Sequence, residues 1–387
     1  MSLPALRFKE FNEDWSVKKL SDIAEKIGDG IHSTPIYDEN GEYYFINGNN
    51  LNNGKIDISK KTKRVNLEEY LKHKVDLTDQ TLLISINGTI GNLAFFNGEK
   101  VILGKSACYI NLKRDENKYF VRNLLQTSNI SNHFNKELTG SSIKNLSLST
   151  IKNTKAFFPS HEEQDKIANF LTAIDKKIAQ LARMHELLTQ YKTGAMQNIF
   201  NLKLRFKDDN GKDFLEWNEV ALNDLCDIQK GKQLNKSELN DFEEFPVING
   251  GQEPSGYTNT WNTEANTITI SEGGNSCGFV NLIKQKFWSG GHCYSLVNIK
   301  TGINNFFLYH ALKFYEEQLK RLRIGSGLPN IQKSAISDFT FKIPMSNKEQ
   351  IRIANFFDAI DEKIAATQSQ LEAVKQYKQG LLQQMFV

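Results

Sequence analysis

Two nearly identical stretches decide how this chain is organised. Glu163-Gln164-Asp165-Lys166-Ile167-Ala168-Asn169-Phe170 returns 186 positions later as Glu349-Gln350-Ile351-Arg352-Ile353-Ala354-Asn355-Phe356. Between 163–200 and 349–386, 19 of 38 aligned residues are identical. An internal repeat predicts units that fold alike, and missing it would misassign the whole architecture.

Both repeated stretches have the pattern of a long helix. Apolar residues step by three and four for more than four heptads, as in the a/d seam of a coiled coil. Pro159 and Pro344 stand just upstream, where the start of a helix tolerates proline. A helix of about 36 residues spans about 54 Å, so we expect two of them to form a rigid antiparallel spacer. The predicted seam residues are Ile167, Leu171, Ile174, Ile178, Leu181, Leu188, Ile353, Phe357, Ile360, Ile364, Leu371 and Val374.

Some residues interrupt this seam. We expect the polar members to set the register or to lie at frayed ends, and not to be ligands. They are His185, Lys192, Thr367 and Lys378. Gly194 and Gly380 also fall inside the pattern, and we expect them to kink the helices or end them early. The alternative, that each helix packs only on its own domain, does not explain the length and repetition of the seam.

The segments outside the helices repeat only weakly. Arg7 and its neighbours return around Arg205, Ile46-Asn47-Gly48 returns as Ile248-Asn249-Gly250, and Cys108-Tyr109 returns as Cys293-Tyr294. These segments mix strand-like and helix-like runs. We predict strands at 81–86, 92–96, 101–103 and 267–271, and helices around 118–137 and 304–323.

The predicted fold class is therefore α+β. Two α/β domains are joined by two long helices that form an antiparallel coiled coil, with pseudo-two-fold symmetry. We place the domains at 1–159 and 201–344, and the spacer helices at 160–200 and 345–387. The similar helical segments are expected to have the same role in both copies, whereas the diverged domains are expected to have a different role in each copy.

Loops rich in Asn, Gly, Ser and Thr separate the predicted strands. Such side chains can bond base edges, and Lys or Arg can reach guanine or phosphate. The same residues are also common in ordinary turns, so each one taken alone is more simply a turn residue. As a class, loops carry binding residues on a rigid scaffold. The candidate DNA-binding residues are Ser33, Thr34, Asn47, Asn49, Asn50, Asn87, Thr89, Lys105, Ser141, Ser142, Lys144, Lys230, Lys232, Gln233, Asn249, Gln252, Tyr257, Asn275, Ser326 and Asn330.

The bulk composition neither requires nor excludes nucleic acid. The net charge is only +3, from 48 basic and 45 acidic residues, so a DNA reader would need a local basic surface. The first residues contain no apolar signal segment, and no run is long enough for a membrane span. The four cysteines form no CxxC pair, which predicts a reducing cytoplasm.

The known signatures of catalysis are missing from the sequence. Gly98 and Gly104 have five residues between them, where a phosphate-binding loop needs four. None of the seven prolines follows Asn, Asp or Pro or precedes Asp, which excludes the common adenine-methyltransferase and nuclease motifs. His292-Cys293 with Cys277 lacks a second zinc-ligand pair. We therefore expect no catalytic site, no metal site and no cofactor in this chain.

The layout resembles the specificity subunits of type I restriction–modification enzymes. The twin Glu-Gln…Ile-Ala…Asp-x-x-Ile segments at 163–178 and 349–364 carry the resemblance, together with the openings Trp15…Leu20 and Trp217…Leu222. It covers essentially all 387 residues.

This resemblance implies a particular division of labour. Each domain would be a target recognition domain that reads one half of an asymmetric bipartite site in double-stranded DNA. Two methyltransferase subunits would use S-adenosylmethionine to make N6-methyladenine, and two ATP-dependent restriction subunits would bind as well where they are present. We expect the outward helix faces, including Lys177 and Lys363, to dock the methyltransferase. The alternatives are a self-contained enzyme with an unrecognised site and a coiled-coil scaffold that never touches DNA.

Overall fold

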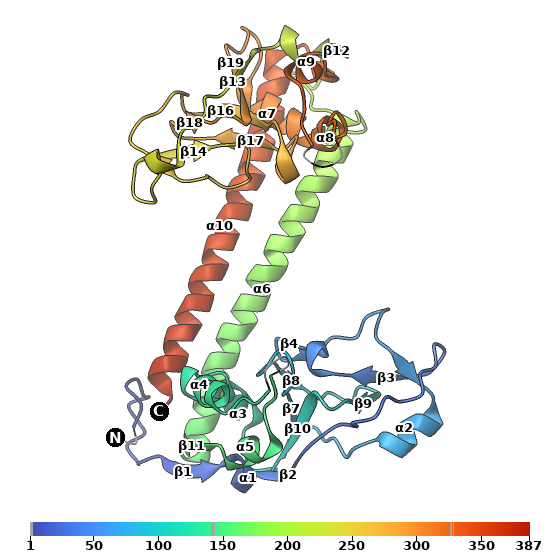
Figure 1. Cartoon of the computed structure of the whole chain (residues 1–387), viewed down its shortest axis with the longest axis vertical. Helices are drawn as coiled ribbons and strands as arrows, with labels where there is room; N and C mark the ends of the chain where they lie inside the picture. Colours follow the sequence, from blue (N-terminus) through green and yellow to red (C-terminus); the bar gives the residue numbers. More distant parts are fainter. Residues whose placement is uncertain (1–2, 141–143, 326, 328) are drawn as a thin grey trace. The chain divides into compact units, whose positions relative to one another are not determined.

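The chain folds into two units, each built from separate parts of the sequence. The computed structural model describes residues 3–140, 144–325, 327 and 329–387. Unit 1 comprises Met1–Ala182 and Ser369–Val387, and unit 2 comprises Arg183–Gln368. The division falls inside the two longest helices, α6 (His161–Phe200) and α10 (Asn347–Met385) (Figure 1). Each unit therefore contains one half of each helix.

Unit 1 is centred on a four-stranded antiparallel sheet in the order β2-β10-β7-β8. A three-stranded sheet, β6-β3-β9, and the pairs β1-β11 and β4-β5 complete its strands. Every residue of β7 and β10 is buried, which explains why their sequences are continuous runs without polar alternation. The elements are β1 Ser16–Lys19, α1 Leu20–Ile23, β2 Ala24–Asp29, β3 Tyr43–Ile46, η1 Gly48–Asn50, β4 Leu51–Asn52, β5 Lys55–Ile56, β6 Arg64–Val65, α2 Leu67–His73, β7 Thr81–Ser85, β8 Leu93–Phe95, β9 Val101–Leu103, β10 Ala107–Leu112, α3 Lys118–Leu125, α4 Ser128–Lys136, α5 Leu148–Asn153 and β11 Lys155–Phe158.

Unit 2 repeats this topology. Its central sheet runs β13-β19-β16-β17, its three-stranded sheet β15-β14-β18, and its flanking pair β12-β20. Each matches a sheet of unit 1, including the parallel pairing of β3 with β9 and of β14 with β18. The elements are β12 Trp217–Ala221, η2 Leu222–Asp224, β13 Asp227–Lys230, η3 Lys236–Glu238, β14 Phe245–Ile248, β15 Tyr257–Thr258, β16 Thr267–Ser271, η4 Gly274–Ser276, β17 Val280–Ile283, β18 Trp288–Ser289, β19 Cys293–Val297, α7 Asn305–Phe314, α8 Glu316–Arg321, α9 Lys333–Ser337 and β20 Thr340–Pro344.

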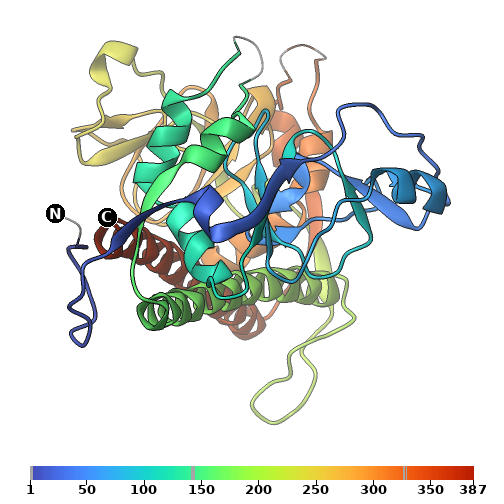
Figure 2. The same cartoon turned by 90° about the horizontal axis from the view of Figure 1, so that it is seen from below.

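The two long helices run antiparallel within each unit. In unit 1 the first half of α6 lies beside the last turns of α10 (Figure 2), and both contribute side chains to one apolar core. In unit 2 the last turns of α6 and the first half of α10 do the same. The predicted α+β fold with an antiparallel helix pair is thus confirmed.

An aromatic residue anchors the end of each helix in a domain core. Phe386, directly after α10, lies edge-on to Trp15 in unit 1, with ring centroids 6.4 Å apart. Its repeat partner Phe200 lies edge-on to Trp217 in unit 2, at 6.0 Å. Such pairs add about 0.5–1.5 kcal/mol beyond the burial of their surface.

The helix glycines do not end the helices early, so that part of the prediction was wrong. The helices continue through Gly194 and Gly380 to Phe200 and Met385. A glycine in a helix costs only about 1 kcal/mol relative to alanine. Each is followed by buried apolar residues, so packing of the last turns offsets that cost.

The other local predictions were mostly right. The four predicted strands are present as β7, β8, β9 and β16. Each predicted helix around 118–137 and 304–323 is instead two shorter helices, α3 with α4 and α7 with α8. In unit 1 the break falls where the Thr127 hydroxyl accepts a hydrogen bond from the Ile130 N–H and caps α4.

The strand register corrects one repeat that the sequence suggested. Ala107 pairs with Ser85, and Cys293 occupies the same place opposite Ser271. Cys293 is therefore equivalent to Ala107, one residue away from Cys108. The shared Cys-Tyr dipeptide is a coincidence of sequence, because register follows hydrogen bonding between strands.

Among the described residues, no helix has both the length and the apolarity that a membrane span requires.

Candidate nucleic-acid interface

In unit 1 the loops that follow four different strands meet at one edge of the domain. The Ile31 N–H donates to the Leu103 carbonyl at 2.8 Å, which joins the segment after β2 to β9. The Gly48 N–H donates to the Ser106 hydroxyl at 2.8 Å, which joins the loops after β3 and β9. The Gly88 N–H donates to the Lys144 carbonyl at 3.1 Å, which adds the loops after β7 and α4.

Unit 2 builds the same loop cluster with equivalent backbone contacts. The Lys232 N–H donates to the Ser289 carbonyl at 2.8 Å, as that of Ile31 does to Leu103. The Glu272 N–H donates to the His292 carbonyl at 2.9 Å, as the Ile86 N–H of unit 1 does to the Ser106 carbonyl at 3.0 Å. The Gly274 N–H donates to the Pro329 carbonyl at 3.0 Å. The backbone hydrogen bonds that join these loops are therefore common to both units, whereas the side chains that the loops carry differ between the units.

Most of the candidate DNA-binding residues lie in these two clusters or beside them. The exposed ones are Ser33, Thr34, Asn49, Thr89, Lys105, Lys144, Lys230, Lys232, Gln233, Gln252 and Asn275. The half-buried ones are Asn47, Asn50, Asn87, Asn249, Tyr257 and Asn330. Ser141, Ser142 and Ser326 lie outside the described residues.

Two of the candidates hold the loops together. The side-chain oxygen Oδ1 of Asn47 accepts a hydrogen bond from the Ser106 hydroxyl at 2.8 Å. The side-chain Oδ1 of Asn249 accepts one from the His292 backbone N–H at 3.1 Å. There is no room for a side chain between these loops, since a Cβ on Gly104 would lie 2.3 Å from the Asn47 oxygen. Asn47 and Asn249 thus brace the loop cluster. Asn50 is also engaged, because its side-chain N–H donates to the Asp57 carbonyl at 3.0 Å.

In unit 1 the cluster surrounds a hollow of about 810 Å³. Asn87 and Lys105, both predicted candidates, line it together with Asp29 and His32. The His32 ring nitrogen Nε2 lies 2.9 Å from an Asp29 carboxylate oxygen. The Asp29 carboxylate, which accepts hydrogen bonds, therefore lines the same hollow as Asn87 and Lys105, whose side chains can donate them.

In unit 2 a buried carboxylate organises the cluster. Glu272 is 5% exposed, and it accepts hydrogen bonds from the Lys230 ammonium at 2.5 Å and the Tyr294 hydroxyl at 3.0 Å. Nδ1 of His292 lies 3.4 Å from its other oxygen. Burial opposes ionisation of Glu272, but the bonds from Lys230 and Tyr294 outweigh it and hold the pKa of this carboxyl below its usual value. Burial and the neighbouring carboxylate raise the pKa of Tyr294 to about 12.

Sequence reasoning missed Asp29, His32, Glu272 and His292. The predicted candidates were amide, hydroxyl, phenol and lysine side chains of the loops, so no carboxylate or imidazole was among them. The available signal was position: Asp29 stands directly before Gly30, and Lys230 directly before Gly231, at the same strand end.

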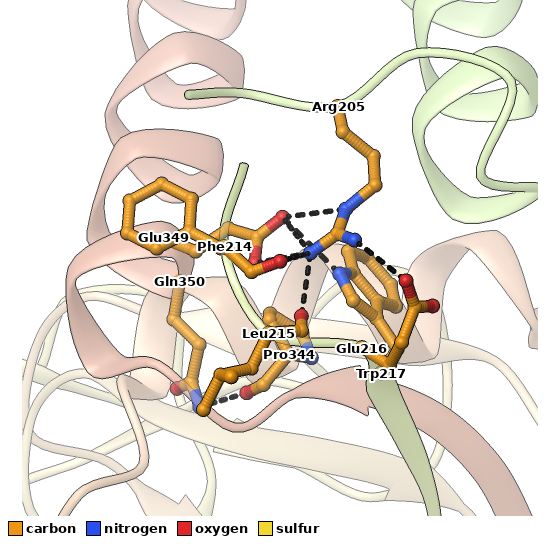
Figure 3. Close-up of polar contacts among 8 residues, drawn as sticks. All are labelled: Arg205, Phe214, Leu215, Glu216, Trp217, Pro344, Glu349 and Gln350. Carbon is orange, nitrogen blue, oxygen red and sulfur yellow. Dashed lines mark hydrogen bonds and ion pairs between the residues drawn. The ribbon is translucent and has the colours of Figure 1, made fainter. Parts of the chain in front are cut away.

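The repeated Glu-Gln motif attaches each domain to its helix. In unit 2 the buried Glu349 carboxylate accepts hydrogen bonds from the Arg205 guanidinium at 3.1 Å and from the Trp217 indole N–H at 3.2 Å (Figure 3). The Gln350 side-chain N–H donates to the Pro344 carbonyl at 2.9 Å, just before α10 (Figure 3).

Unit 1 carries the same attachment. Arg7 donates to Glu163 through two nitrogens, at 2.8 and 2.7 Å, and the Gln164 side chain donates to the Pro159 carbonyl at 3.3 Å. Because buried charges require partners, this constraint explains why the motif recurs in both copies.

The lysines in the predicted seam form reciprocal ion pairs. In unit 2 Lys192 of α6 donates to both Asp361 oxygens of α10, at 2.6 and 2.7 Å. In unit 1 Lys378 of α10 donates to Asp175 of α6 at 2.7 Å. Asp175 and Asp361 are repeat partners, as are Lys192 and Lys378, so the repeat builds the same contact twice.

The apolar seam residues face the packed side of the helices. Ile167, Leu171, Leu181, Ile353, Phe357, Ile360 and Leu371 are buried. Ile174, Ile178, Leu188, Ile364 and Val374 are half-buried. Lys177 and Lys363 are exposed on their own units, where a partner can reach them.

Within the described ranges no three His, Cys, Asp or Glu side chains gather closely enough to hold a metal ion. The four cysteines are buried and unpaired by disulfides. Burial raises the pKa of the Cys293 thiol to about 11 and that of Cys226 to about 12, so both stay protonated.

Comparisons with known proteins give a consistent result. The family described as type I restriction modification DNA specificity domain matches twice, over residues 12–190 and 215–376. A Methanocaldococcus jannaschii protein, provisionally named the type I restriction enzyme MjaX specificity subunit, is 26% identical over 403 residues. That match covers 96% of this chain and 93% of the relative.

Two further similarities involve Mycoplasma genitalium. Its protein S.MgeORF438P, provisionally named a type I specificity subunit, is 28% identical over 173 residues. That match spans 44% of this chain and 45% of that relative. The crystal structure of a type I restriction–modification S subunit from M. genitalium has a TM-score of 0.71 at 20% identity, over 100% of this chain and 99% of the other. At this identity the likeness shows the fold alone.

Proposed function

Because the chain belongs to the type I restriction modification DNA specificity domain family, we propose that each of its two units reads one half of an asymmetric, bipartite DNA site. The chain is a non-catalytic specificity subunit of a type I restriction–modification system. Its contribution is therefore recognition and placement, and the chemistry belongs to its partners.

One observation supports this proposal above the others. The two units present the same loop cluster on the same strand ends, but with different side chains. A common frame with divergent loops suits two readers of different sequences, since base edges are distinguished by their pattern of donors and acceptors. A scaffold that never contacts DNA gives no reason for that divergence.

The proposal includes the predicted division of the chain. Residues 1–159 and 201–344 form the readers, and 160–200 and 345–387 form the spacer helices that set the gap between half-sites. Domains joined in this way read half-sites about one helical turn, roughly 34 Å, apart on the duplex. The site is asymmetric because the two readers differ.

The proposed partners are double-stranded DNA, two methyltransferase subunits and, where present, two restriction subunits. S-adenosylmethionine and ATP would be bound by those partners, and this chain would need no cofactor. The methyltransferase reaches its target adenine at N6 by flipping the base out of the stack. A cytoplasmic location follows from the DNA target and from the four free cysteines.

The helices are the proposed docking surface for the methyltransferase. Their seam side is buried, whereas Lys177 and Lys363 stand exposed at equivalent positions of the repeat. Equivalent exposed positions on two copies can bind two copies of one partner.

A methylation map tests the proposed function. The chain is expressed with its neighbouring methyltransferase subunit in a host without adenine methylation, and the genome is sequenced by a method that reads modified bases. We expect a split, asymmetric motif with one methyladenine in each half-site.

Two controls make the map decisive. The methyltransferase expressed alone should leave no such motif. If a complex that demonstrably assembles produces no methylation and binds no DNA in a salt-dependent manner, the proposed function is wrong and the scaffold alternative stands.

A further inference from the structure

The two units carry side chains of opposite charge at one equivalent position of their loop clusters. Asp29 ends β2 and pairs with Cys108 of the neighbouring strand, and Lys230 ends β13 and pairs with Tyr294. Since Ala107 and Cys293 are equivalent, Cys108 and Tyr294 are equivalent as well. Strand register thus places Asp29 and Lys230 at the same point of the fold.

The glycines that follow support this equivalence. A Cβ on Gly30 would lie 1.9 Å from the Leu103 carbonyl oxygen, and one on Gly231 would lie 2.2 Å from the Gly290 carbonyl oxygen. Only glycine allows the backbone to approach the parallel-paired loop so closely. In both units the close approach fixes the preceding residue on the same side of the cluster.

The two side chains have opposite hydrogen-bonding chemistry. The Asp29 carboxylate only accepts hydrogen bonds, and its side chain is 21% exposed in the hollow that Asn87 and Lys105 also line. Lys230 only donates, and its side chain is 52% exposed. Glu272 holds its ammonium from the buried side, which leaves the remaining N–H groups free to face a ligand.

Base edges discriminate between such groups. In the major groove, cytosine presents the N4 amino donor, which a carboxylate accepts. Adenine also presents a donor, but its N7 acceptor lies beside it and would repel the carboxylate. Guanine presents two acceptors, O6 and N7, which suit a lysine.

We infer that Asp29 and Lys230 determine the base specificity of their units. Asp29 accepts a hydrogen bond from a cytosine in one half-site, and Lys230 donates to a guanine in the other. This inference rests on the proposed function, because it requires that each unit reads a half-site. It adds the class of base that each unit selects.

The test compares methylation maps of single variants. Asp29→Asn replaces the carboxylate by an amide that bonds adenine at N6 and N7. In a complex that still assembles, it should reduce methylation of cytosine-containing sites about 10-fold or more relative to adenine-containing sites, at one position of one half-site. The other half-site should be unchanged and serves as the internal control.

Lys230 has a matched pair of variants. Lys230→Met should relax the guanine preference by a similar factor in the opposite half-site, whereas Lys230→Arg should retain it, because arginine donates to the same two acceptors. If Lys230→Met fails to assemble because Glu272 loses its partner, Lys230→Gln is the replacement, with a shift from guanine toward adenine as the expected result.

The outcomes separate the two claims. If the wild-type complex methylates no split site, the proposed function fails. If it methylates a split site but a half-site contains no G·C pair, or Asp29→Asn keeps the wild-type motif at full stringency, the inference is overturned while the proposed function stands.

Discussion

Asp175 provides the most direct test of how the two long helices are held together. It accepts hydrogen bonds from Arg122 of α3 and Lys378 of α10, both at 2.7 Å. Its repeat partner Asp361 receives its described ion pair from a single cation, Lys192. The substitution Asp175→Asn therefore leaves two cations without their counter-charge, and Asp361→Asn leaves one.

The expected magnitudes follow from burial. The side chains of Arg122 and Lys378 are only 12% and 11% exposed, and burial lowers the pKa of Lys378 although Asp175 opposes this effect. Breaking a fully buried pair costs about 3–5 kcal/mol. Asp175 is 27% exposed, so we expect a loss of about 3 kcal/mol for Asp175→Asn. One charged hydrogen-bonding partner is worth about 1.5 kcal/mol, which is the loss expected for Asp361→Asn.

Denaturant unfolding of the purified chain measures both losses. Circular dichroism in urea gives the free energy of unfolding, and hydrogen exchange of the β10 and β19 amides assigns the loss to unit 1 or unit 2. A third variant, Asp175→Asn with Lys378→Met, removes one stranded cation and should recover part of the stability.

Some results would refute this reasoning. If Asp361→Asn costs as much as Asp175→Asn, the second cation on Asp175 contributes nothing. If both losses are below about 0.5 kcal/mol, the pairs behave as ordinary surface salt bridges.

Three further predictions concern other parts of the chain. Glu349→Gln should cost about 2 kcal/mol in urea unfolding, because it removes the buried counter-charge of Arg205 and leaves it only the exposed Glu216 and backbone carbonyls (Figure 3). A loss under about 0.5 kcal/mol would contradict this. Charge reversal of Lys177 and Lys363 together should weaken co-purification with the methyltransferase subunit while the circular dichroism spectrum stays unchanged; undiminished co-purification would count against this docking surface. Burial lowers the pKa of His310 below 6.5, although Asp358 opposes the shift, so its stabilising effect is present above pH 6.5 and is lost as the pH falls below that value. Thermal melts from about pH 7.5 to 5.5 should show a weaker pH dependence for His310→Gln than for the wild type, and equal slopes would count against it.

The architecture could be predicted from the sequence because its determinants are local. Helical periodicity marks the long helices wherever they pack, and a repeat at an offset of 186 marks two copies of one unit. The periodicity also places Lys192 and Lys378 in the seam, but it does not identify the carboxylates with which they pair. The pairing of Lys192 with Asp361 depends on which halves of the helices lie together.

The limits of helical prediction were also physical. Gly194 and Gly380 have a poor intrinsic helix propensity, yet the last turns remain helical because Phe200 and Phe386 are anchored in domain cores. Propensity is a property of the isolated segment, and the packing that overrides it joins residues distant in sequence.

The sequence by itself determined the number of units and the two long helices, and it marked the loops that we propose to read DNA. Only the tertiary structure decided which loop residues are equivalent, since alignment by identity matched Cys108 with Cys293 and concealed the correspondence of Asp29 with Lys230. The reason is that strand register is set by hydrogen bonds between distant segments, and a shift of one residue exchanges the side chains on the two faces of a strand.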